Sequence, residues 1–206
     1  MKRARTLVTA CTALLLAVAL SACGGPSAGT TEPAEGGAYH MTAPPSDAGA
    51  HNDADTEFAQ MMIVHHQGAI EMAELAAAKA STPDVRSLAS AIAAAQGPEI
   101  DLMTSWLKAW GEDEPAETQM GGMDHDSMTM DGMDQEGVMN ELSGLTGADF
   151  DRRFLELMTD HHRGAITMAE KHLAAGQNED ARKLSRSIID AQTKEITTMT
   201  NLRLAL

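Results

Sequence analysis

The stretch DTEFAQMMIVHHQGAIEMAE, residues 55–74, occurs a second time as DRRFLELMTDHHRGAITMAE, residues 151–170. Eleven of the twenty positions are identical, and the two copies are offset by 96 residues along their whole length. The match continues without a gap into the following segments, as far as Met103 and Met199. Such a repeat predicts one structural unit used twice. Each unit carries two adjacent histidines among methionines.

Residues 1–22 have the features of a signal peptide that is removed from the mature protein. Three basic residues precede an apolar run at 7–20, which is too short to cross a membrane as a stable helix. The run ends in Leu-Ser-Ala-Cys, which resembles the bacterial lipobox and predicts lipidation of Cys23; the alternative is an ordinary secretory signal with a chance cysteine. We therefore expect a lipoprotein of the cell envelope, anchored to the membrane on its extracytoplasmic side. Residues 23–52 are rich in Gly, Pro, Ser, Thr and Ala, as in a flexible tether.

The mature chain is strongly acidic. The full sequence has 15 basic and 30 acidic residues, and loss of residues 1–22 removes three basic ones, which changes the net charge from −15 to −18. Such a surface attracts cations and argues against nucleic acid as a partner. Cys11 leaves with the signal peptide and Cys23 carries the lipid, so the mature domain has no thiolate. Any chemistry with soft metals must come from methionine and histidine.

The folded part, residues 53–205, is predicted to be all-α, because no stretch shows the alternation of a strand. Repeat one, 53–110, and repeat two, 146–205, each read as a hairpin of two long helices. The connection between them, 111–145, is long, acidic and rich in methionine. Two short turns and one long crossover predict a four-helix bundle of the ferritin-like arrangement. Gly176 is predicted to end the third helix in the left-handed conformation.

Helical spacing places one histidine of each repeat inside this bundle. The apolar stripe of the first helix includes His65, and the matching stripe in repeat two includes His161. Antiparallel packing within each hairpin sets His65 level with Glu99 and His161 level with Glu195. We expect one interior layer to hold these four side chains, with methionines about one turn away. The methionines of this predicted site are Met62, Met72, Met103, Met158, Met168 and Met199.

Two explanations fit a polar layer in an apolar seam, since unsatisfied buried polar groups are costly. The layer is either a metal site on the bundle axis or a set of hydrogen bonds from each histidine to a glutamate of its own hairpin. The seams also hold Gln96 and Gln192, where a plain core would have leucine. His66 and His162 are either further ligands or partly exposed groups at a helix boundary. The pattern is duplicated and flanked by thioethers, which favours the metal site.

The crossover contains a second candidate site in MGGMDHDSMTMDGM, residues 120–133. It has no helical periodicity, and packing alone does not explain its methionines. Thioethers with one imidazole suit Cu(I) or Ag(I), and the interleaved aspartates suit Cu(II). The alternative is a solvated loop without a function. The candidate ligands are Met120, Met123, His125, Met128, Met130 and Met133.

The pattern FxxxMxxHHxxAIxMA, present at 58–73 and again at 154–169, resembles the bacterial family DUF 305. This family is classed with ferritin-like four-helix bundles and includes copper-binding proteins of the CopM type. The resemblance implies a role in copper binding for the histidines and methionines of both motif copies. We expect a metal-handling protein rather than an enzyme. One departure from symmetry is Asp160, which stands where the first copy has Val64.

Copper, as Cu(I) or Cu(II), is therefore the expected ligand, held for buffering, resistance or handover to a copper-handling partner protein. One alternative is a ferritin-like di-metal redox enzyme, but its Glu-x-x-His motif is missing, because Met62 and Met158 stand three residues before His65 and His161. The other alternative is a structural envelope lipoprotein whose buried His–Glu pairs fix the helix register.

Overall fold

The computed structural model describes residues 49–115 and 133–206. These residues form five helices and no strand. The helices are α1 (Asp53–Lys79), α2 (Pro83–Trp110), α3 (Gln135–Gly144), α4 (Gly147–Ala175) and α5 (Glu179–Ala205). The all-α fold predicted from the sequence is confirmed. Within the described ranges, no helix is long and apolar enough to cross a membrane.

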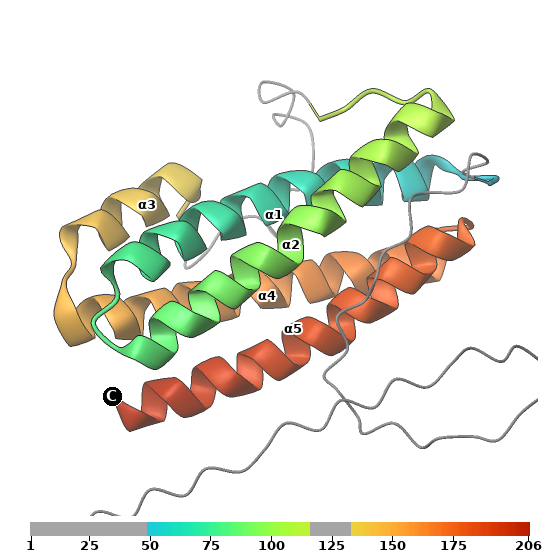
Figure 1. Cartoon of the computed structure of the whole chain (residues 1–206). Helices are drawn as coiled ribbons and strands as arrows, with labels where there is room; N and C mark the ends of the chain where they lie inside the picture. Colours follow the sequence, from blue (N-terminus) through green and yellow to red (C-terminus); the bar gives the residue numbers. More distant parts are fainter. Residues whose placement is uncertain (1–48, 116–132) are drawn as a thin grey trace, which may run out of the picture. The chain divides into compact units, whose positions relative to one another are not determined.

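Two helical hairpins, α1–α2 and α4–α5, pack against each other to form the four-helix bundle (Figure 1). The closest contact between the hairpins is that of α1 with α4, whereas α2 and α5 touch little. Helices α1 and α4 run antiparallel, because the start of α1 at Asp55 meets the turn after α4, and the start of α4 at Asp151 meets the turn after α1. The repeated stretches therefore lie side by side at the centre of the molecule.

Two crossed carboxylate contacts join the hairpins. Asp55 accepts hydrogen bonds from the backbone N–H groups of Gln177 and Asn178, at 3.0–3.1 Å. Asp151 accepts bonds from the backbone N–H groups of Ser81 and Thr82, each at 2.8 Å, and from both hydroxyl groups. The two contacts are related by the 96-residue offset. The aspartate of each repeat therefore binds the turn between the two helices of the other repeat. Both aspartates are fully buried.

Local capping explains where the long helices begin. The Asn52 side chain accepts from the Asp55 N–H, and Asp55 accepts from the Asn52 N–H in return, which forms a capping box. The Asn178 side chain accepts from the N–H groups of Asp180 and Ala181 at the start of α5. Thr82 precedes Pro83 at the start of α2, but its hydroxyl binds Asp151 instead of its own helix.

The prediction for Gly176 is wrong. Its φ of −71° and ψ of 150° are extended, not left-handed. Glycine is needed there for space, because a Cβ atom would overlap the imidazole of His172 and come within 2.8 Å of Asp55 Oδ1. Close approach, rather than backbone conformation, therefore explains this residue.

Helix α3 lies in the crossover and was not anticipated from the sequence. It packs beside α1 and α4, at the end of the bundle where the α1–α2 turn lies (Figure 1). Its first residue, Gln135, donates to the carbonyl oxygen of Gly68 at 3.1 Å and to Glu71 at 2.8 Å. A Cβ at Gly68 would lie 2.9 Å from the Gln135 side-chain oxygen, so this glycine makes room for α3.

Small side chains recur in the buried faces of α1 and α4. Several alanines of these two helices have no exposed surface. They are Ala59, Ala69, Ala73, Ala76, Ala165 and Ala169. Larger apolar groups fill the interior on either side of the centre, in two separate clusters of buried residues.

We expect the crossed contact at Asp151 to contribute strongly to stability. The variant Asp151→Ala leaves two backbone N–H groups and two hydroxyls without their charged acceptor, which should lower the free energy of unfolding by about 2–3 kcal/mol. The control is Asp149→Ala, because that side chain is 84% exposed on the same helix, and it should change stability by less than about 0.5 kcal/mol. Urea unfolding followed by circular dichroism measures both, and equal effects of the two variants would contradict the assignment.

Candidate metal centre

His65 of α1 and His161 of α4 meet on the bundle axis. Their ring centroids are 3.6 Å apart, with 44° between the ring planes. The residues are only 4% and 5% exposed. The 96-residue offset relates them to each other, so a pseudo-twofold axis passes between the two imidazoles.

His66 and His162 face the outer helices of their own hairpins. His66 Nε2 lies 2.7 Å from Glu99 Oε2 on α2, and His162 Nε2 lies 2.6 Å from Glu195 Oε2 on α5. Both histidines are fully buried, so the expectation that they are partly exposed is wrong. The expected pairing of glutamates with His65 and His161 is also wrong, because the adjacent histidine of each repeat takes the glutamate.

The six methionines of the predicted site are all in the bundle interior. Five have no exposed surface and Met168 is 7% exposed. They separate into two groups of three, one on each side of the histidine layer. One cluster holds Met62, Met103 and Met168. The other holds Met72, Met158 and Met199.

Each group of three methionines takes two members from one hairpin and one from the other. Met62 and Met103 belong to repeat one, and Met168 belongs to α4 of repeat two. The second group is the reverse, with Met158 and Met199 from repeat two and Met72 from repeat one. In α1, Met62 lies one turn before His65, and Met72 lies two turns after it. The interior is thus layered as thioethers, imidazoles and thioethers.

The central imidazoles are neutral at pH 7. Burial lowers the pKa of His65 well below its ordinary value of 6.5, and charge repulsion from His66 and His162 lowers it further. Burial lowers the pKa of His161 in the same way, and repulsion from His65 is the next cause. A neutral imidazole keeps a lone pair with which to bind a metal.

Several buried polar atoms of this layer have no hydrogen-bond partner within the described chain. They include both ring nitrogens of His65 and the Nδ1 atoms of the other three histidines, as well as the side-chain oxygens of Gln96 and Gln192. Buried polar atoms are normally paired, and unpaired ones call for an explanation such as a bound ion or water. The donor set of neutral imidazoles and nearby thioethers suits Cu(I) or Ag(I). In the described ranges, however, no three side chains among His, Cys, Asp and Glu gather as ligands of one ion. Methionine and glutamine are the other side-chain donors available to an ion in this part of the bundle.

Glu99 and Glu195 bond His66 and His162 and can orient these two histidines. With each glutamate accepting from His Nε2–H, the Nδ1 atoms of His66 and His162 are left as lone-pair donors. This is the arrangement in which a carboxylate fixes the tautomer of a metal-binding histidine.

The structure does not extend to most of the crossover site. Met120, Met123, His125, Met128 and Met130 lie outside the described residues, as does Cys23. Met133 is half-buried and packs against the cluster that contains Met72 and Met158. Packing therefore explains this one methionine of the crossover, contrary to the sequence expectation.

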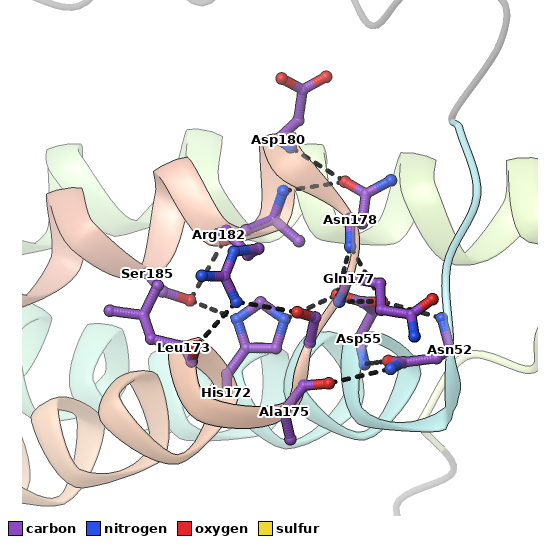
Figure 2. A network of polar contacts seen from close by, with 12 residues as sticks. Asn52, Asp55, His172, Leu173, Ala175, Gln177, Asn178, Asp180, Arg182 and Ser185 are labelled. Atoms are coloured by element: carbon purple, nitrogen blue, oxygen red, sulfur yellow. Dashed lines mark hydrogen bonds and ion pairs between the residues drawn. The ribbon is translucent and has the colours of Figure 1, made fainter.

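A second buried polar network, missed by the sequence analysis, lies at the start of α1 (Figure 2). His172 Nε2 is 2.8 Å from Asp55 Oδ1, and His172 Nδ1 is 2.7 Å from Ser185 Oγ. Its residue types are those of a hydrolase triad, but all three are at most 2% exposed and the serine hydroxyl also bonds the Ala181 carbonyl. The imidazole also stacks on Phe58 at 4.2 Å. The network joins helices and offers no nucleophile to a substrate. In repeat one, Ala76 and Ala89 stand at the equivalent positions of His172 and Ser185.

Residues 55–203 match the family profile described as "Domain of unknown function (DUF305)". The chain belongs to the DUF305 family. No curated protein matches its sequence. Both copies of the His-His motif and both crossed aspartates lie within the matched residues.

Solved structures of the family share this fold. A putative secreted DUF305 protein from Streptomyces coelicolor is 32% identical, with a TM-score of 0.64 over 72% of this chain and 89% of that one. A DUF305 fragment from Deinococcus radiodurans is 30% identical, with a TM-score of 0.67 over 77% of this chain and all of that one. CopM in its Cu(II)-bound form is 32% identical, with a TM-score of 0.63 over 73% of this chain and 96% of that one. CopM also has structures in Cu(I)-bound and Ag-bound forms.

The buried histidines should make the metal-free protein less stable in acid. The pKa values of His65, His161 and His172 are all lowered in the folded state. The unfolded chain therefore takes up protons first as the pH falls below about 6.5. The free energy of unfolding should decrease from about pH 7.5 to about pH 5.5, by at most about 1.4 kcal/mol per pH unit for each such proton.

Urea unfolding of the metal-free protein at several pH values measures this dependence. The matched variant is His172→Ala, which copies Ala76 of repeat one and should reduce the slope because one of the three titrating groups is gone. A stability that stays constant or rises in acid would contradict the prediction.

Proposed function

We propose that this DUF305 protein binds copper in the interior of its helical bundle, for buffering, resistance or handover. The observation that carries the proposal is the pair of neutral imidazoles in contact on the axis, with buried methionines on either side. Both ring nitrogens of His65 and the Nδ1 of His161 have no hydrogen-bond partner in the described chain. Without an ion, the bundle bears the free-energy cost of buried polar atoms that are not hydrogen-bonded. A soft cation supplies what these lone pairs lack.

The chemistry of the layer favours copper over harder metals. Magnesium and calcium prefer oxygen ligands, whereas imidazole and thioether groups prefer Cu(I) and, for imidazole, also Cu(II). Binding to a neutral imidazole displaces no proton from the lone pair, so the low pKa of His65 keeps the site ready near neutral pH. His66 and His162 are oriented by their glutamates and supply further Nδ1 donors.

The family relationship supports this proposal independently. CopM, which shares the fold and 30–32% of the sequence, has structures in Cu(II)-bound, Cu(I)-bound and Ag-bound forms. The metals in these CopM structures are soft or borderline ions, which the imidazole and thioether groups of this bundle also suit. The acidic character of the chain, with a net charge of −15, favours the approach of any cation.

The proposal includes an extracytoplasmic location. The signal-like residues 1–22 and the lipobox-like segment ending at Cys23 support a lipid anchor in the cell envelope. A protein without thiolates in an oxidising compartment would rely on methionine for Cu(I), as this chain does. The methionines of segment 120–133 would then capture ions outside the bundle and pass them inward or to a partner protein.

A non-catalytic role fits the interior better than a redox enzyme does. The carboxylates of a ferritin-like di-metal site would bind the ions directly, whereas Glu99 and Glu195 are each paired with a histidine. The purely structural alternative explains these two pairs as determinants of helix register. It does not explain His65 and His161, which pair with no carboxylate.

We expect the axis histidines to be required for tight copper binding. The double variant His65→Leu/His161→Leu should lower the affinity for Cu(I) by about 100-fold or more, because two first ligands are lost. Its stability should be unchanged or higher, since three of the four ring nitrogens it removes are buried without a hydrogen-bond partner and leucine fills similar space. Competition with a chromogenic Cu(I) chelator measures the affinity, and urea unfolding measures the stability.

His51→Ala is the matched control, because His51 lies outside the bundle interior, stacked on Trp110, and its loss should leave the affinity unchanged. Two results would end the proposal. One is wild-type binding weaker than about micromolar. The other is a folded double variant that binds as tightly as the wild type.

Lipidation at Cys23 gives a separate test of location. The wild-type protein, expressed in a bacterial host that processes lipoproteins, should incorporate labelled fatty acid and partition into detergent, and Cys23→Ala should do neither. Cys11→Ala is the control and should behave as the wild type. An unlabelled wild-type protein found in the medium would contradict the anchor without affecting the copper site.

A further inference from the structure

Two buried glutamines accompany the histidine layer of the proposed copper site. Gln96 of α2 and Gln192 of α5 are each 3% exposed. The side-chain oxygen of each has no hydrogen-bond partner within the described chain. They are related by the same 96-residue offset as the histidines, so one explanation should hold for both unpaired oxygens.

The register of the helices places these oxygens in the central layer. Gln96 lies three residues before Glu99, so both are on one face of α2, and Glu99 binds His66. Counting back along the antiparallel pair sets Gln96 level with Ala69 of α1. Ala69 lies four residues after His65, on the same face of α1, and has no exposed surface. Its small side chain leaves the glutamine access to the interior.

The register between the hairpins brings each glutamine close to the axis histidines. The ring contact between His65 and His161 fixes how α1 and α4 run past each other at the centre. Ala69 lies four residues, about one turn, after His65. Gln96, which is level with Ala69, therefore lies about one turn from the axis pair, and Gln192 has the equivalent place in repeat two. Orphan amide oxygens and orphan ring nitrogens are thus within about one helical turn of each other.

The amide oxygen is a different kind of donor from the thioethers above and below it. Cu(I) favours sulfur and imidazole, whereas oxygen ligands favour harder ions, including Cu(II). A central layer of imidazole nitrogens and amide oxygens suits Cu(II), while the outer groups of three methionines suit Cu(I). The glutamines are the only oxygen donors with unpartnered atoms at this level among the described residues.

We propose that Gln96 and Gln192 set the oxidation state that the central layer accepts, by placing unpaired amide oxygens within about one helical turn of the imidazoles of His65 and His161. The proposal rests on copper binding by the bundle and adds residues that select Cu(II). It predicts opposite changes in the affinities for the two ions when oxygen is replaced by sulfur. A purely space-filling glutamine, or one that holds a water molecule, would change neither.

The test is the double variant Gln96→Met/Gln192→Met, which keeps the side-chain length and replaces each amide by a thioether. Its affinity for Cu(II) should fall by about 10-fold or more, and its affinity for Cu(I) should rise. The double variant Gln96→Leu/Gln192→Leu removes the oxygen without adding sulfur, so it should lose Cu(II) affinity and keep that for Cu(I). Gln67→Leu is the control, because Gln67 is next to the histidine pair in sequence but exposed.

Each variant is titrated with Cu(II) against a competing chelator and, without oxygen, with Cu(I) against a chromogenic one. The electron paramagnetic resonance spectrum of the Cu(II) form should differ between wild type and both glutamine variants, and not in the control. Circular dichroism checks that each variant is helical.

Three outcomes would overturn the inference. Folded glutamine variants with unchanged Cu(II) affinity and an unchanged spectrum would show that the amides only fill space or hold water. Equal losses for both ions would show that the glutamines shape the site without selecting an oxidation state. A wild type that binds Cu(I) but not Cu(II) would remove the selection while leaving the proposed function intact, whereas a wild type that binds neither ion would end both.

Discussion

The crossed contacts of Asp55 and Asp151 determine how the two repeats meet. Each carboxylate is buried, and each accepts from the backbone of the turn in the other repeat. Burial alone would raise the pKa of Asp55, but bonds from His172 and from the backbone of Asn52, Gln177 and Asn178 together hold it below its ordinary value. An ionised carboxylate is thus retained in the interior by donors that only the correct pairing supplies. Any slip of α1 along α4 would remove the donors from the other repeat and leave only the bond from Asn52 of its own helix, which is a strong penalty for wrong registers.

The candidate metal centre follows from this register. With the ends of α1 and α4 fixed, His65 and His161, which are the same position in each repeat, meet near the middle of the contact. A pseudo-twofold axis at that point makes every ligand appear twice, so two thioether groups flank the pair on opposite sides. The symmetry is broken at one end, where His172 and Ser185 replace two alanines and add a hydrogen-bonded link to Asp55. The polar atoms there are satisfied, whereas those of the centre are not.

The repeat and its helical periodicity were sufficient to predict the all-α bundle, because long amphipathic helices with short turns allow few other arrangements. The sequence could not show which histidine of each His-His pair lies on the bundle axis and which one binds a glutamate. Neighbouring residues on a helix are about 100° apart, and α1 is covered by α2 on one side and by α4 on another. Both histidines are therefore buried, but against different helices. A single seam, as used in the sequence analysis, can represent only one of these contacts.

Two other features could not be predicted for related reasons. Gly176 depends on a close approach to Asp55 and His172, which are 121 and 4 residues away in sequence. Helix α3 depends on Gln135 reaching the backbone of Gly68, a contact that no local pattern announces. In both cases the glycine is explained by a contact with a segment far away in the sequence, and not by its own backbone conformation.

The unpaired atoms of the central layer connect stability with binding. A protein interior that leaves imidazole and amide atoms without partners is less stable than one with leucine at those positions. This free-energy cost falls on the metal-free bundle and is offset when an ion occupies the site. A ligand that binds the folded chain stabilises it in proportion to its concentration over the dissociation constant. The same atoms that weaken the empty bundle therefore raise the affinity for an ion able to accept their lone pairs. The crossed aspartates and the His172 network, whose polar atoms are fully paired, hold the bundle together while its centre stays unsatisfied. The hydrogen-bonded networks at the ends thus keep the bundle folded, while the unpaired atoms at the middle suit the proposed binding of a soft cation.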